Sequence, residues 1–213
     1  GGPQFRTVTW QRNLAKLGKP VDHEEWYLLP HEVNALNVPL ENRIIFPASI
    51  LQAPFFDGAA DDAVNYGSMG TVIGHEISHS FDNMGSLFDE RGRMHNWWTP
   101  EDQKRFEKAG DALAKQYDGY RPFPDLGVNG RLTLGENIAD VAGLSTAWDA
   151  YQVSQEGKPP QVLDGFTPAQ RFFLGFGQSY RSKEREPALR NALLADPHAP
   201  DHYRAQTVRN VDA

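Results

Sequence analysis

The segment His75-Glu76-Ile77-Ser78-His79 restricts the possible folds of this chain more than any other feature. Two histidines four residues apart lie on one side of an α-helix, about 40° apart around its axis, so both imidazoles can reach one metal ion. Glu76 lies between them, where it could take a proton from a water molecule at the open position of that metal. The same pattern also occurs on solvated helix surfaces, so the surrounding sequence has to decide.

The residues around this segment predict a helix from about residue 65 to residue 84. A histidine or glutamate without a partner is costly in a buried helix, which favours a ligand role for His75 and His79. Glycines in the same stretch each lower helix stability by up to about 1 kcal/mol relative to alanine, which indicates close packing against a neighbour. The predicted buried face consists of Tyr66, Met69, Val72, Ile73, Ile77 and Phe81, and the glycines are Gly67, Gly70 and Gly74.

A zinc site of this kind needs a third protein ligand, and the chain contains no cysteine. In thermolysin-like sites the third ligand is a glutamate from a later helix. Glu136 and Asp140 lie four residues apart in a predicted helix over about 133–152, so Glu136 could bind zinc while Asp140 accepts a hydrogen bond from a ligand histidine. Asp82 is a second candidate for that orienting role. The alternative is an ordinary acidic first turn that interacts with the helix dipole.

The remaining pattern predicts a mainly α, α+β chain with one small β element. Residues 43–47 read as an edge strand or extended segment that ends at a proline. Thr99-Pro100 and Thr167-Pro168 are typical helix starts, the first helix reaching about residue 117. Residues 1–30 are expected to form short elements joined by turns, and residues 181–186 a solvated helix face or loop. Without a repeat or a composition shift, residues 1–213 are expected to form a single domain.

Composition excludes several partner classes. The net charge is −7 with no basic stripe, which argues against nucleic acid and anionic membranes. No stretch approaches the roughly 20 apolar residues of a membrane span. Because the sequence opens with Gly1-Gly2-Pro3 and has no initiator Met, we expect a fragment of a longer protein, and its compartment and oligomeric state stay open.

Further stretches accompany the zinc segment in one order along the chain. Together they resemble the neprilysin-type zinc metallopeptidases, which include the endothelin-converting enzymes and bacterial oligopeptidases, from about Trp10 to the end. The stretches are Val33-Asn34-Ala35, residues 46–56 and 72–82, Asn65-Tyr66-Gly67, Asn96-Trp97-Trp98-Thr99, residues 135–140 (Gly-Glu-Asn-Ile-Ala-Asp) and Asp196-Pro197-His198-Ala199-Pro200.

This resemblance implies a thermolysin-like zincin catalytic domain, with one Zn²⁺ per chain held by His75, His79 and Glu136 and with Glu76 as general base. It further implies that Asn34 and Ala35 bind the substrate backbone. The remaining implied roles are oxyanion stabilisation by His198, a grip on a substrate carbonyl by Arg204, and a pocket for the residue after the scissile bond formed by Ile50, Phe55 and Val72. Without the resemblance, His198 and Arg204 would read as a turn histidine and a surface arginine.

The implied function is a zinc-dependent endopeptidase that cleaves oligopeptides on the amino side of large hydrophobic residues. Family members carry a large N-terminal helical domain over the active site and a further C-terminal segment, and we expect both to be missing from this fragment. Bacterial relatives suggest a periplasmic or secreted parent. The alternative is a catalytically silent, zinc-stabilised fragment that binds peptides, although an intact Glu76 counts against it. Side-chain preference is left open by departures from the family pattern at Leu36, Asn37, Thr71, Ser179 and Tyr180.

Overall fold

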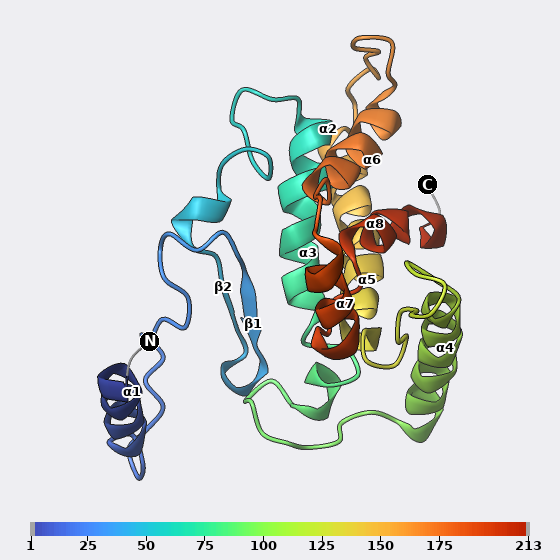
Figure 1. The fold of residues 1–213 in the computed structure, drawn as a ribbon. Coiled ribbons are helices and arrows are strands. Elements are labelled where there is room, and N and C mark those ends of the chain that lie inside the picture. Colours follow the sequence, from blue (N-terminus) through green and yellow to red (C-terminus); the bar gives the residue numbers. More distant parts are fainter. Residues whose placement is uncertain (1–2, 212–213) are drawn as a thin grey trace.

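The computed structural model describes residues 3–211 and is built mainly of helices (Figure 1). A two-stranded sheet is the one regular β element among these residues, so the predicted mainly helical class is confirmed. The longer helices are α1 (Pro3–Leu14), α3 (Thr71–Ser78), α4 (Pro100–Asp118), α5 (Leu134–Ser154), α6 (Pro168–Ser179) and α7 (Glu186–Ala195); short ones are α2 (Asp62–Asn65), the π-helical turn Tyr66–Gly70 and α8 (Asp201–Arg204). The strands are β1 (Leu36–Val38) and β2 (Arg43–Ile45).

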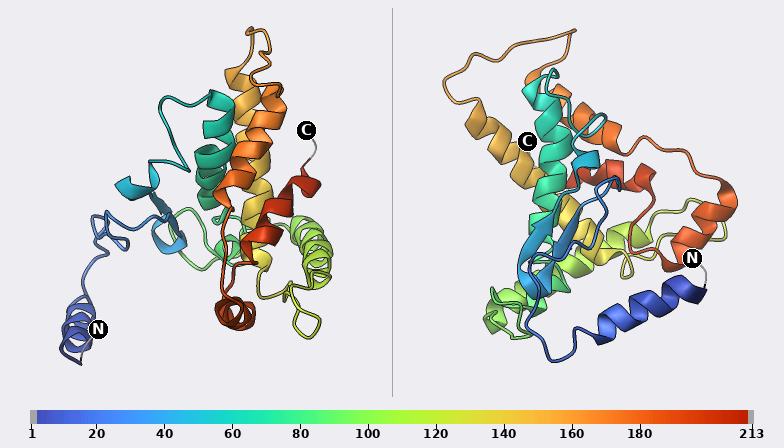
Figure 2. Two further views of the ribbon diagram at one scale, coloured as in Figure 1. Left: turned by 45° about the horizontal axis from the view of Figure 1, so that its top comes forward. Right: turned by 90° about the vertical axis from the view of Figure 1, so that its left-hand side faces the viewer.

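Helices α3 and α5 lie side by side at the centre of the molecule, as all three ribbon views show (Figures 1 and 2). Their backbones approach closely at Gly74 and Gly143: a Cβ atom on Gly74 would lie 2.7 Å from the Gly143 carbonyl oxygen. Only glycine allows this separation, which explains why the metal helix tolerates residues of low helix propensity. The main apolar core lies beside the crossing and joins α2, α5 and α6 through Ala63, Tyr151 and Phe172, all at most 4% exposed.

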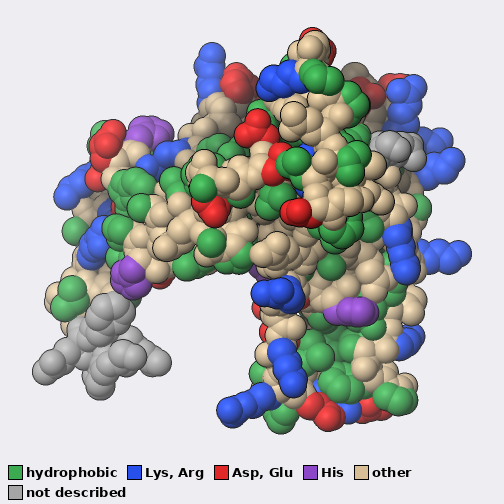
Figure 3. All heavy atoms as spheres, turned by 90° about the horizontal axis from the view of Figure 1, so that it is seen from above, with side chains coloured by type: hydrophobic (Ala, Val, Ile, Leu, Met, Phe, Trp, Pro, Cys, Tyr) green, Lys and Arg blue, Asp and Glu red, His purple; other side chains and the backbone are tan. Residues whose placement is uncertain are grey.

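The strands β1 and β2 form an antiparallel hairpin that lies next to α3 (Figure 1). Leu36 pairs with Ile45 and Val38 with Arg43, so Asn37 stands in the middle of β1 opposite Ile44. Helix α1 stands apart from the helical body at the N-terminal end (Figure 2). In the space-filling view the outline is hollowed between this N-terminal part and the helical body, and acidic and basic side chains are intermixed over both (Figure 3).

The predicted buried face of the metal helix is partly wrong. Ile73, Ile77 and Phe81 are 41%, 45% and 51% exposed, whereas the face toward α5 carries Thr71, Gly74 and His75. The reason is the close α3–α5 approach, which leaves room only for small and polar side chains on that side. Helix α3 also ends at Ser78 rather than near residue 84, and a π-helical turn precedes it.

Other sequence predictions can now be compared with the structure. The strand at residues 43–45, the helices α4 and α5, and the capped start of α6 are confirmed, and Thr167 and Gln170 form a capping box. Residues 1–30 contain a longer helix, α1, than the short elements predicted there. Residues 181–185 are an exposed loop that leads into α7. Among the described residues, no helix is long and apolar enough to cross a membrane.

Candidate metal centre

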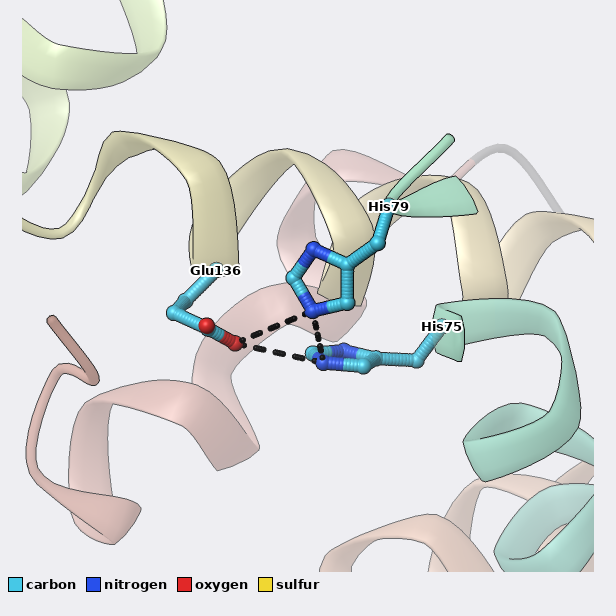
Figure 4. A group of neighbouring side chains, drawn as sticks. All are labelled: His75, His79 and Glu136. Atoms are coloured by element: carbon cyan, nitrogen blue, oxygen red, sulfur yellow. Dashed lines mark hydrogen bonds and ion pairs between the residues drawn. The ribbon is translucent and has the colours of Figure 1, made fainter. Parts of the chain in front are cut away.

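His75 lies in α3, and His79 lies at the C-terminal end of that helix. Both converge with Glu136 from the first turn of α5 (Figure 4). The Nε2 atoms of His75 and His79 lie 2.9 Å apart, and both face the Glu136 carboxylate. Its Oε2 atom lies 3.2 Å from His75 Nε2 and 3.5 Å from His79 Nε2. The three side chains thus offer ligand atoms that all lie within 4.8 Å of one another.

A carboxylate holds the outer nitrogen of each histidine. His75 Nδ1 lies 2.8 Å from Asp140 Oδ1, and His79 Nδ1 lies 2.6 Å from Asp82 Oδ2. A carboxylate accepts hydrogen bonds, so each Nδ1 carries the hydrogen and each Nε2 of the neutral ring presents its lone pair inward. Asp140 and Asp82, the two candidates that the sequence offers for the orienting role, thus lie against different histidines.

This donor set fits a zinc ion. Inward lone pairs only 2.9 Å apart repel each other unless a proton or a cation lies between them. Glu136 Oε2 is buried and has no hydrogen bond of good geometry, although imidazole nitrogens lie 3.1–3.5 Å from it. Two imidazoles and one carboxylate are the protein ligands of a catalytic His₂Glu zinc site, and three protein ligands leave a fourth position open.

The electrostatics of the cluster show how strongly it favours a central positive charge. Burial works to lower the pKa of His79, but Asp82 and Glu136 outweigh it and raise that pKa to about 10. The pKa of His75 is also raised, because Asp140 and Glu136 outweigh its burial. Burial opposes ionisation of Glu136, yet its contacts with His198, His75 and His79 hold the pKa well below the usual range. A divalent cation would replace the protons that this cluster otherwise retains.

Behind His75 lies a buried ionic network. Asp140 is completely buried and accepts two hydrogen bonds of 2.8 Å from the Nε and Nη2 groups of Arg204. Tyr180 donates a further hydrogen bond of 3.2 Å to Asp140 Oδ1, and Arg204 lies over the Tyr180 ring. Burial would raise the pKa of Asp140, but the Arg204 guanidinium and His75 hold it well below its usual value. Asp140 is therefore a permanent anion that fixes the His75 ring.

Two further predicted residues, Glu76 and His198, line the same cavity as the three ligands. Glu76 is 6% exposed, and burial raises the pKa of its carboxyl group. His198 lies with Nε2 3.1 Å from Glu136 Oε2, and its Nδ1 lies 2.8 Å from Asp196 Oδ1. The contact with Glu136 raises the pKa of His198 above its usual value, although burial works in the opposite direction.

One cavity of about 560 Å³ contains these groups, a size typical of small-molecule and peptide sites. All of the sequence-predicted site residues line it except Asp140, which lies behind the wall. The lining includes Asn34, Ala35, Ile50, Phe55, Val72, His75, Glu76, His79, Asp82, Glu136, His198 and Arg204. The five positions that depart from the family pattern, Leu36, Asn37, Thr71, Ser179 and Tyr180, line the same cavity.

Sequence reasoning missed several contacts in this region, among them the ion pair between Arg204 and Asp140. Asp196 bonds to the ring of His198, two residues later in the same sequence motif, and that short spacing is a usable signal for a side-chain hydrogen bond. Tyr180 approaches Asp140 from α6, forty positions along the chain, and nothing in its local sequence indicates that contact. The bond from Asn37 to the backbone of α3 is equally non-local.

Comparisons with known proteins identify the family of this chain. The model of peptidase family M13 matches residues 34–213. The chain is 42% identical over 206 residues to Neprilysin-11 of Caenorhabditis elegans, with 93% of this chain and 24% of that protein covered. It is 38% identical over 204 residues to human endothelin-converting enzyme 1, with 94% and 26% covered.

Solved structures show the same relationship. The zinc metalloprotease Zmp1 of Mycobacterium tuberculosis, in complex with an inhibitor, matches with a TM-score of 0.94 and 47% identity over 96% of this chain and 32% of that one. PepO of Lactobacillus rhamnosis matches with a TM-score of 0.79 and 42% identity, over 90% and 29%. The chain spans about a quarter to a third of the length of these relatives. On this evidence, the chain belongs to peptidase family M13.

Proposed function

We propose that this chain carries the catalytic centre of a zinc-dependent endopeptidase that hydrolyses peptide bonds in oligopeptides. The observation that supports this most is the convergence of His75, His79 and Glu136 beside a buried carboxyl group, Glu76, in one cavity. One zinc ion per chain would be held by those three ligands. When bound, zinc polarises a carbonyl group and lowers the pKa of a water molecule to about 7.

Glu76 is proposed as the general base. Its carboxylate takes a proton from the water molecule while the water oxygen forms a bond to the carbonyl carbon of the substrate. The same carboxyl group then gives that proton to the amide nitrogen as the C–N bond breaks, which releases an amine and a carboxylic acid. The acid proton, the second one from the water molecule, then passes to the amine and leaves a carboxylate. Burial raises the pKa of the Glu76 carboxyl group above its usual value, which suits a group that both accepts and donates a proton.

His198 is proposed to stabilise the negative charge that develops on the substrate oxygen. His198 lines the cavity with its Nε2 atom 3.1 Å from Glu136 Oε2, and its contact with Asp196 holds the other side of the ring. A single preorganised donor of this kind contributes on the order of 3 kcal/mol to transition-state stabilisation. Arg204 also lines the cavity, where it is proposed to contact a substrate carbonyl beyond the scissile bond while Asp140 fixes its orientation.

The peptide is proposed to bind along β1. Within residues 3–211, β1 pairs only with β2, so its other edge can accept a peptide strand through main-chain hydrogen bonds. Asn34 and Ala35 come directly before β1 and line the cavity, which places them where the backbone of such a peptide would pass.

The cavity wall supports a preference for a large hydrophobic residue just after the scissile bond. Ile50 belongs to a buried apolar cluster against which Phe55 and Val72 pack, and all three line the cavity. Thr71 and Ser179 add hydroxyl groups to the same cavity, and the Thr71 hydroxyl already donates to the Gly67 carbonyl. We therefore propose cleavage on the amino side of large apolar residues.

A further part of a longer protein is proposed to cover this side of the molecule. Ile77 and Phe81 are 45% and 51% exposed next to the metal ligands. The relatives are several times longer than this chain, which supplies the additional mass that such a cover requires. The cover would restrict substrates to oligopeptides.

The test combines metal content with cleavage of a quenched fluorescent oligopeptide, with and without a chelator. We expect about one zinc per chain, chelator-sensitive cleavage, and loss of turnover by about 10²- to 10⁴-fold in Glu76→Gln with zinc content unchanged. Near-normal cleavage by Glu76→Gln would contradict the proposed base. Zinc binding without any cleavage by the unchanged chain would favour the silent peptide-binding alternative.

A further inference from the structure

The side chain of Asn37 connects the hairpin to the end of the metal helix. Its Nδ2 group donates to the carbonyl oxygen of Glu76 at 2.6 Å and to the Ser80 hydroxyl oxygen at 3.0 Å. Asn37 is 8% exposed and occupies the middle of β1, directly beside α3 (Figure 1). The two bonds span about forty residues of sequence, so they are tertiary contacts rather than local capping.

These bonds meet the helix where its own hydrogen bonding changes. The Ser80 N–H bonds to the Ile77 carbonyl and the Phe81 N–H to the Ser78 carbonyl, so the chain tightens after the last turn of α3. The Glu76 carbonyl in that turn receives the Asn37 amide instead. His79 is the C-cap residue of α3 and therefore stands where helices open most readily.

The chemistry of the contact fixes the orientation of the amide. A main-chain carbonyl only accepts hydrogen bonds, so the NH₂ group of Asn37 must face Glu76 and its Oδ1 atom must point elsewhere. That Oδ1 atom is buried and has no hydrogen-bond partner. An unpaired buried acceptor is destabilising, and a leucine of similar size has no such acceptor. If the two hydrogen bonds that Asn37 donates contributed nothing, replacing Asn37 by leucine would therefore stabilise the fold.

We propose that Asn37 is a positioning residue that fixes the peptide-binding edge to the metal helix. It sets the place of the Glu76 backbone and of His79 relative to Asn34 and Ala35, which lie three and two residues before it. This inference rests on the proposed function for its link to catalysis, but its effect on metal binding can be measured independently.

The test compares Asn37→Leu with the unchanged full chain. Zinc affinity is measured by competition with a fluorescent chelator, and amide hydrogen exchange is followed over residues 79–82. We expect zinc affinity to fall by about tenfold and exchange over 79–82 to accelerate, because the end of α3 loses its tertiary support. In peptide cleavage, kcat is expected to fall more than KM changes, since the geometry of the reacting groups is disturbed rather than the peptide contacts.

Asn65→Leu is the matched control. Asn65 also holds backbone with its amide, accepting from the Asp57 N–H at 3.0 Å and donating to the Asp57 carbonyl at 2.8 Å, but at the other end of the helical segment. A purely structural role for Asn37 predicts that both variants lower thermal stability and that both have the same zinc affinity. Our inference predicts that only Asn37→Leu weakens zinc binding.

Ser80→Ala provides a second variant if Asn37→Leu fails to fold. It removes one of the two acceptors, and a two- to fivefold loss of zinc affinity supports the inference. Unchanged zinc affinity and unchanged exchange over 79–82 in a folded Asn37→Leu, or in Ser80→Ala alone, would overturn it. Failure of the unchanged chain to cleave any peptide bears on the proposed function, whereas the zinc and exchange measurements still decide on Asn37.

Discussion

The part of the molecule that holds the metal ligands differs in construction from the part proposed to hold the peptide. On the metal side, α3 and α5 meet at two glycines, and Asp140 is completely buried with a bidentate arginine. On the peptide side, strands of three residues form a hairpin, α1 stands apart, and Trp26 and Leu40 are 58% and 64% exposed.

This difference follows from what each side has to do. A zinc site must be in place before its ion arrives, since ligands that move lose affinity, so its orienting groups are buried and charged. A peptide-binding edge is completed by the peptide strand itself, and so it can stay a short hairpin with an unpaired side. Damage to the first side should therefore affect both stability and metal binding. Damage to the second side should affect peptide binding alone, except at Asn37, whose hydrogen bonds join the hairpin to the metal helix.

The largest effect is expected for Asp140→Asn. Removing this charge leaves Arg204 buried without a counter-charge, which destabilises the folded state by about 3–5 kcal/mol. Zinc affinity should fall by about 10- to 100-fold because His75 loses its orienting carboxylate. Chemical denaturation and zinc competition measure the two effects. Asp125→Asn, which breaks the exposed bidentate pair with Arg190, is the control and should change neither quantity appreciably. Equal effects of the two variants would contradict the special role of the buried pair at the metal side.

A smaller effect is expected for Gly143→Ala at the α3–α5 crossing. The added Cβ atom would lie 2.5 Å from the His75 backbone nitrogen, so the helices must separate at a cost of about 1–3 kcal/mol, with weaker zinc binding. Gly177→Ala in α6 is the matched control, because no atom lies within 4 Å of its added Cβ. There we expect a gain of up to about 1 kcal/mol from helix propensity. Thermal unfolding with and without zinc gives both values, and a neutral Gly143→Ala would show that the crossing is not tight.

Zinc binding is expected to release protons at pH 7.5. Without metal, the pKa of His79 is about 10, so its ring carries an extra proton that zinc must displace. Apparent affinity should therefore rise with pH between about 6 and 9, and about one proton or more should leave per zinc bound. Calorimetric titrations in buffers with different ionisation enthalpies count the protons. If no proton is released, the metal-free cluster does not carry the extra proton on His79 on which this prediction depends.

The smallest effect is expected for Asn34→Ala, on the peptide side. It should raise KM for peptide cleavage by about three- to tenfold, the value of one hydrogen bond, and leave zinc affinity and thermal stability near the unchanged chain. Asn34 accepts only from the adjacent Ala35 N–H in the structure, so little of the fold depends on it. Steady-state kinetics and zinc competition on the same sample check this. A loss of zinc affinity in Asn34→Ala would contradict the separation between the peptide contacts and the metal ligands.

Much of the local structure could be predicted from sequence. Thr99-Pro100 and Thr167-Pro168 mark helix starts because a side-chain oxygen can cap the first turn, and both caps form. The outward position of Ile73 and Ile77 could not be predicted, because apolar periodicity shows that a helix has an apolar side and does not show what covers it. The hydrogen bonds of Tyr180 and Asn37 could not be predicted either, since each joins groups from separate elements.

The sequence by itself determined the donor chemistry: two histidines one turn apart with a glutamate between them, a later glutamate–aspartate pair at the same spacing, and no cysteine to compete. Helical geometry makes that spacing meaningful without any tertiary information. Only the tertiary structure decided which acid orients which histidine, that Arg204 is bound to Asp140, and that Asn37 joins the hairpin to the metal helix. Those arrangements depend on the distance between α3 and α5 and on where the hairpin rests, and packing sets both.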